Sequence, residues 1–98
     1  MKLENIKSKI LPTFDNVGIG HATRYGEWLF ISGQIPIDKE GHIVGKNDVR
    51  AQTIQVYKII QGILDELGSG LDNIMKLTTF YVNSDDFPKI AEVRKSFF

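Results

Sequence analysis

The sequence predicts an α+β fold with the element order β-β-α-β-α, in which both helices pack on one face of a mixed sheet. Three observations lead to this fold class. Aromatic and β-branched residues surround a glycine near position 26, apolar residues recur at helical spacing over 49–67, and alternating residues follow over 74–82. The 98 residues are enough for a single domain, 1–98, which we divide into an N-terminal arm and loop over 1–19 and a core over 20–98.

Composition narrows the classes of function. The lack of cysteine excludes disulfides, thiolate catalysis and iron–sulfur clusters. Twelve basic residues balance twelve acidic ones, whereas nucleic-acid binders usually carry a basic excess, so we expect no nucleic-acid partner. No apolar run approaches the roughly 20 residues that span a bilayer, and residues 1–7 lack the apolar core of a signal peptide. We therefore expect a cytoplasmic protein without membrane association.

The N-terminal arm predicts a short amphipathic helix over 3–11, which Pro12 ends. Its apolar residues fall at helical spacing: Leu3, Ile6 and Ile10. The glycine-rich stretch 15–20 that follows predicts a loop, because no third glycine stands at the spacing of a dinucleotide-binding motif.

A β-hairpin is predicted next, with strands over 21–24 and 28–32 joined by a turn at Gly26. Residues 28–31 form a continuously apolar run. Such a run is typical of a strand that is covered on both faces, so we expect a helix on one side and another subunit on the other.

The longest predicted element is a helix over 49–67. Asn47 or Asp48 can cap its start, and Gly68 stands where a left-handed residue ends a helix. A strand over 74–82 and a last helix, capped by Asp85-Asp86, complete the order. A ferredoxin-like arrangement needs a further strand after this helix, so we expect the C-terminal strands to be missing.

Four segments, taken in order, resemble a known family. They are Gly26-Glu27-Trp28-Leu29-Phe30-Ile31-Ser32-Gly33-Gln34-Ile35-Pro36, then Gln52, then Gly68 with Leu71 to Val82, and finally Asp86-Phe87 with Phe97-Phe98. Their order and separations resemble the Rid family, the reactive intermediate deaminases, also called YjgF-like or L-PSP endoribonuclease-like proteins. The resemblance covers nearly everything from about Gly20 to the last residue.

The resemblance implies a chorismate-mutase-like fold and a homotrimer with ligand pockets in the clefts between subunits. It also implies hydrolysis of reactive enamines and 2-imino acids to keto acids and ammonia, so the expected ligand is a small imino or keto acid. A protonated imine is already electrophilic, so such a site has only to hold a carboxylate and position one water, without a cofactor. The neutral charge favours this metabolite chemistry over the ribonuclease activity after which some members are named.

Site residues follow from the same resemblance. Ser32 and Gly33 match the family's pocket floor, and Phe87 matches an aromatic wall. Ile19 lies in the loop that borders this pocket and His21 comes directly after it, so both are further ligand-binding candidates. We expect no metal site, because His21 and His42 are far apart and lack a third ligand.

Four polar groups that active members use are replaced or absent. Ile19 stands where they have a tyrosine and Ala91 where they have an asparagine, and their arginine and glutamate strands lie beyond Phe98. Arg24 and Arg94 could replace the arginine, although solvated arginines are more common. We therefore assign no catalytic residue and keep two alternatives. The first is a non-catalytic ligand-binding or partner-binding module, and the weaker one is an L-PSP-type endoribonuclease or translation inhibitor.

Overall fold

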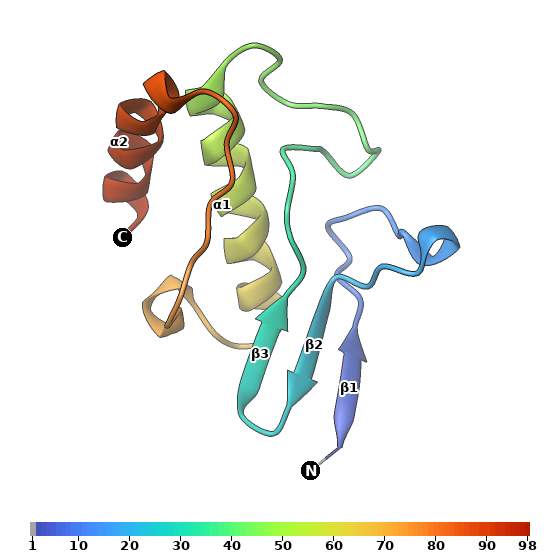
Figure 1. Ribbon diagram of the computed structural model, residues 1–98. Coiled ribbons are helices and arrows are strands. Elements are labelled where there is room, and N and C mark those ends of the chain that lie inside the picture. Colours follow the sequence, from blue (N-terminus) through green and yellow to red (C-terminus); the bar gives the residue numbers. More distant parts are fainter. Residues whose placement is uncertain (1) are drawn as a thin grey trace.

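A three-stranded antiparallel sheet and two helices make up the fold in a computed structural model, which describes residues 2–98 (Figure 1). The strands, in the order β1-β2-β3 across the sheet, and the helices have these bounds: β1 Leu3–Ile6, β2 Ala22–Tyr25, β3 Trp28–Ile31, α1 Val49–Glu66 and α2 Phe87–Phe97. Short 3-10 turns cover Asp15–Val17, Leu71–Asn73 and Ser84–Asp86. The α+β class is therefore confirmed, but the expected mixed sheet is wrong, because both strand pairs in the described part of the chain are antiparallel.

The helix expected over 3–11 is wrong, because this stretch contains strand β1 instead. It pairs with β2 from Leu3↔Tyr25 to Ile6↔Ala22. An isolated helix of this length is marginal in water, since its nucleation cost is spread over few hydrogen bonds. Pairing with β2 gives the same backbone groups partners at once. A neighbouring strand therefore decides the structure of the arm.

The predicted hairpin is confirmed. Gly26 has a φ of 61°, the left-handed conformation that its turn requires. On β3, Leu29 and Ile31 pack against the core, whereas Trp28 and Phe30 point to the other face and are 53% and 64% exposed. The chain thus covers one face of this apolar strand and leaves the other open.

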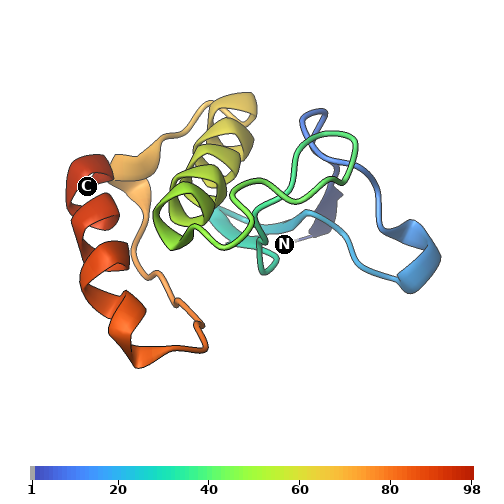
Figure 2. The same ribbon diagram turned by 90° about the horizontal axis from the view of Figure 1, so that it is seen from above.

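The helix predicted over 49–67 is confirmed as α1, and it packs against segments on both of its sides. The Asp48 carboxylate accepts a hydrogen bond from the Ala51 N–H at 3.1 Å, and Gly68 adopts a left-handed φ of 74° after the helix. One side of α1 packs Ile59 and Ile63 against the N-terminal half of the chain. The other side packs Tyr57, Ile60 and Leu64 against Val93 of α2. Figure 2 shows α1 between α2 and the N-terminal segments.

The start of α2 differs from its prediction in one detail. Asp86 occupies the cap position, but its side chain makes no capping hydrogen bond. The Asn83 side chain caps the preceding 3-10 turn instead, accepting from the Asp85 N–H at 3.0 Å. Pro88 lies in the first turn, as expected.

The prediction of a strand over 74–82 is wrong, because this segment pairs with no other strand within 2–98. This segment is not part of the sheet, and no backbone hydrogen bond joins residues 75–82 to the rest of 2–98. Ile74 and Leu77 pack against the core from this segment, whereas Phe80 is 92% exposed. A strand is held by its ladder, so an apolar pattern without a partner leaves the backbone as an irregular connection.

Candidate functional site

A large cavity of about 1360 Å³ separates β3 from the 74–82 segment. Residues 26–36 line one side of it and residues 73–82 line the other. Its third wall is one face of α1, which carries Val56, Tyr57 and Ile60. Two stretches that the sequence singled out thus face the same space.

Ser32 and Gly33 lie on this cavity, directly after β3. The Ser32 N–H donates to the His21 carbonyl at 3.0 Å, and the Ser32 hydroxyl donates to the Gly20 carbonyl at 2.5 Å. These bonds fix the serine and leave its oxygen free to accept. Gly33 is exposed, and a Cβ added there would meet nothing within 4 Å, so its backbone is open to a ligand.

The loop before β2 is tied to this strand end, and it contains Ile19 and His21. Ile19 is half-exposed and its N–H donates to the Phe14 carbonyl at 3.2 Å. His21 is only 3% exposed. Its Nδ1 accepts from the Ser8 N–H at 2.8 Å, so Nε2 carries the proton and donates to the Pro12 carbonyl at 2.8 Å.

Both ring nitrogens of His21 are therefore occupied, and the side chain fastens the arm to the hairpin. A ligand would have to displace one of these bonds, so a binding role for His21 remains a prediction. The arm has a second attachment that the sequence did not indicate. Glu66, at the end of α1, accepts hydrogen bonds from the Ser8 hydroxyl at 2.5 Å and from the Lys9 N–H at 3.1 Å.

Phe87 opens α2 and is half-exposed. Its ring lies against Tyr81, with centroids 6.3 Å apart and planes tilted by 32°. It is not among the described residues that line the large cavity. The structure thus brings Ser32 and Gly33 together with the loop that contains Ile19 and His21, while Phe87 lies outside their cavity.

Tyr57 is the residue of the cavity that sequence reasoning missed. It is 3% exposed, yet its hydroxyl has no hydrogen-bond partner within residues 2–98. Burial raises the pKa of Tyr57, against the opposing effect of the Arg94 charge. The available signal was a tyrosine three residues before Ile60 on an otherwise aliphatic stripe.

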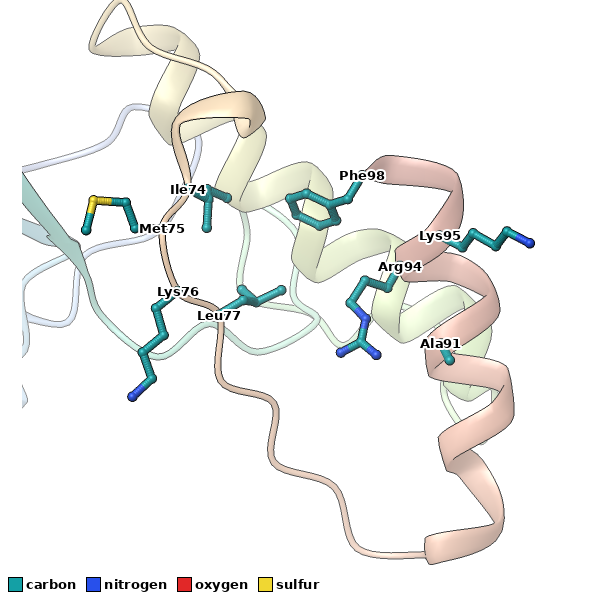
Figure 3. A pocket seen from close by; sticks show the side chains of 8 residues that line it. All are labelled: Ile74, Met75, Lys76, Leu77, Ala91, Arg94, Lys95 and Phe98. Carbon is teal, nitrogen blue, oxygen red and sulfur yellow. The ribbon is translucent and has the colours of Figure 1, made fainter.

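A smaller cavity of about 490 Å³ lies between α2 and residues 74–77 (Figure 3). Arg94 extends from α2 into this space, and Ala91 lies one turn earlier on the helix. Lys76 and Lys95 also line it, and no carboxylate does among the described residues. Arg24 lies instead on the large cavity, so the two candidate arginines occupy separate places.

Other kinds of site find no support in the described residues. No group of three His, Cys, Asp or Glu residues within 2–98 could hold a metal ion. No helix in the same range is long and apolar enough to cross a membrane.

Two helices beside a three-stranded antiparallel sheet define an α+β protein, and its candidate site lies on a cavity where β3 ends. The sequence matches the family model Endoribonuclease L-PSP over residues 18–98. The chain therefore belongs to the endoribonuclease L-PSP family, which confirms the resemblance to Rid proteins.

Relatives with known sequences and structures agree. A RutC family protein from Pyrococcus horikoshii is 44% identical over 78 residues, and one from Pyrococcus abyssi is 38% identical over 77 residues. Each match covers 79% of this chain and 61% of the relative, so the chain spans about three fifths of their length. The solved Rid family protein YyfA from Yersinia pestis is 31% identical with a TM-score of 0.91, and yeast Mmf1 is 26% identical with a TM-score of 0.90. Both structures match 99% of this chain and 76% of their own.

Proposed function

We propose that this protein is a cytoplasmic small-metabolite protein that binds a small imino or keto acid where β3 ends. The observation that carries the proposal is the Ser32-Gly33 pair, a fixed hydroxyl beside an open backbone on the wall of a large cavity. A carboxylate and a carbonyl offer such a site oxygen atoms that accept from N–H groups and a hydroxyl. Family membership supports the same assignment.

The reaction we propose is hydrolysis of a reactive 2-imino acid to the keto acid and ammonia. Water adds to the protonated imine carbon, and the resulting tetrahedral amine releases ammonia as the carbonyl forms. The protein's part is to orient the substrate and exclude competing reactions. Ile19 and Ala91 provide no polar group at two places where active members have one.

Non-catalytic ligand binding is therefore the second candidate. The charged residues that line the large cavity are Arg24, Glu27, Lys76 and Asp86. The candidate site itself, made of the loop over 18–21 and the Ser32-Gly33 pair, contributes no charged side chain to this lining. An endoribonuclease activity, after which the family is named, is the least supported candidate. Two positive and two negative side chains do not form the basic groove that single-stranded RNA requires.

We further propose that three copies assemble through the open face of the sheet. Trp28 and Phe30 form an exposed apolar pair on the side away from the helices, and such patches mark association surfaces. Light scattering after size exclusion should then give three times the mass of the chain. A monomer at the same concentration contradicts the trimer.

Replacement of Gly33 by alanine tests the ligand site. Gly33 has no left-handed φ and no neighbour within reach of a new Cβ, so G33A should fold normally while its methyl group blocks the open backbone. We expect pyruvate to bind the wild type and to bind G33A at least tenfold more weakly, measured by calorimetry. The control is Gly70→Ala, at an equally open glycine that does not line the cavity, and it should bind like the wild type.

Catalysis is measured separately, with an amino-acid oxidase that produces a 2-imino acid continuously. Faster release of the keto acid in the presence of the protein, lost in G33A, supports hydrolysis. Binding that depends on Gly33 without acceleration supports the non-catalytic candidate. Neither binding nor acceleration by the folded protein overturns the proposal, and a mobility shift of single-stranded RNA at low salt would favour the ribonuclease candidate.

A further inference from the structure

Ser32 takes its position from the backbone of the loop before β2. The Ser32 N–H donates to the His21 carbonyl at 3.0 Å, and the Ser32 hydroxyl donates to the Gly20 carbonyl at 2.5 Å. His21 lies between these two planar peptide groups, so a shift of His21 displaces both partners of Ser32. The place where a ligand meets Ser32 and Gly33 therefore depends on what fixes His21.

The His21 ring is fixed by the N-terminal arm. The side chain is buried, its Nδ1 accepts from the Ser8 N–H, and its Nε2 donates to the Pro12 carbonyl, both at 2.8 Å. The Phe14 ring meets it edge-on, with centroids 6.4 Å apart. A neutral imidazole has one donor and one acceptor, and both are used here. The ring thus holds the loop and has no polar atom left for a ligand.

The arm is in turn attached to the end of α1. The Glu66 carboxylate accepts from the Ser8 hydroxyl at 2.5 Å and from the Lys9 N–H at 3.1 Å. Ile10 packs against Gly62, one turn earlier on the helix, where an added Cβ would lie 2.5 Å from the Ile10 side chain. A helix carboxylate therefore fixes the same serine that bonds to the histidine ring.

We propose that His21 is a positioning residue for the ligand site at Ser32-Gly33, and that Glu66 acts on this site through Ser8 and His21. The inference rests on the ligand site proposed above and adds residues that do not touch the ligand. Neither His21 nor Glu66 is among the described residues that line the large cavity. Supporting hydrogen bonds of this kind hold a binding group in its productive geometry, so their loss lowers affinity.

Two variants separate the hydrogen bonds of the ring from its bulk. His21→Leu fills a similar space without polar atoms, whereas the amide of His21→Gln again offers one acceptor and one donor. We expect H21L to bind pyruvate about tenfold more weakly than the wild type, measured by calorimetry, and H21Q to recover most of this loss. The control for stability is Val93→Ala in the core cluster on the other side of α1, and it should bind like the wild type.

Two carboxylates at the end of α1 test the more distant part of the proposal. Glu66→Ala removes a negative charge, and this change alone would favour an anion such as pyruvate. Loss of the bonds to Ser8 and Lys9 acts in the opposite direction, so we expect E66A to bind pyruvate about threefold more weakly. Asp65→Ala makes the same change of charge at the exposed neighbouring carboxylate and should not weaken binding.

Amide exchange without ligand measures the positioning directly. The Ser32 N–H should exchange about tenfold faster in H21L than in the wild type, and H21Q should restore its protection. Unchanged exchange at Ser32 in H21L would overturn the proposal, whether or not pyruvate binds.

The binding results separate this proposal from the ligand site on which it rests. Equal affinity of H21L and the wild type, or equally weak binding by H21L, H21Q and V93A, contradicts the positioning role and leaves the ligand site standing. Failure of the wild type to bind pyruvate, together with faster exchange in H21L, contradicts the ligand site and supports His21 as the residue that positions Ser32.

Discussion

Two stretches of the chain both predict a strand but have different structures. Trp28 to Ile31 is a strand, whereas 74–82 is an unpaired connection. The first stretch has a partner two residues away, because the Gly26 turn brings β2 alongside it. The second follows a helix and finds no neighbour within the described chain. Residue pattern makes a strand possible, and a hydrogen-bonding neighbour makes it form.

The largest expected effect is on the free energy of unfolding, which should fall for a substitution in the packed core around α1 and hardly change for one in the unpaired 74–82 segment. Ile63 is 1% exposed at the centre of the α1 core, so I63A should lower the free energy of unfolding by about 2–5 kcal/mol. Phe80→Ala removes a larger side chain from the 74–82 segment, where it contacts little, and should change stability by less than about 0.5 kcal/mol.

Urea unfolding of both variants at low protein concentration makes this comparison. Similar losses for the two variants would show that Phe80 packs against something, which would break the contrast between the regions. A loss in F80A that appears only at high concentration would place Phe80 in an interface between copies.

An intermediate loss of stability is expected for a substitution where the N-terminal arm contacts the hairpin. His21→Ala removes both ring hydrogen bonds and leaves the buried N–H of Ser8 without a partner, so it should cost about 1–3 kcal/mol. Amide exchange should become faster at Ser8 and in β1, while α1 stays protected. Unchanged exchange at Ser8 would contradict the anchoring role.

His42→Ala is the control for this experiment. His42 is exposed near Asp38, and the backbone N–H of His42 is the main reason that the pKa of Asp38 is lowered. Alanine keeps that N–H, so the variant should stay within about 0.5 kcal/mol of the wild type.

The sequence predicts best what is decided locally. Helix α1 could be placed with its Asp48 cap and the glycine after it, because a helix makes its hydrogen bonds within itself. The hairpin could be placed because its two strands are joined by a tight turn. The arm could not, since its pairing with β2 joins residues about twenty apart and nothing in 3–11 indicates it.

The candidate site divides in the same way. Ser32 and Gly33 were candidates only through the resemblance to the Rid family, and the structure places both on the large cavity directly after β3. The burial of His21 could not be predicted, because its two partners come from Ser8 and Pro12 in a segment without a clear pattern. The cavity itself results from the spacing of elements that are distant in sequence.

The smallest effect concerns Tyr57, which lies between the packed region and the cavity. Burial raises the pKa of Tyr57 above the ordinary 10.0, so the folded protein holds the phenol proton more tightly than the unfolded chain does. The resulting contribution of Tyr57 to the stability of the folded protein is fully present below pH 10, and it is lost as the pH rises from about 10 through the raised pKa. Tyr57→Phe should abolish that alkaline loss. At pH 7 it should change stability by less than about 0.5 kcal/mol, because the hydroxyl has no partner to lose within 2–98.

Urea unfolding from pH 7 to 11 measures both effects, with Tyr25→Phe at an exposed position as the control. A loss above about 1 kcal/mol at pH 7 would mean that the hydroxyl is hydrogen-bonded, and the wall of the cavity would then be less open than the structure indicates.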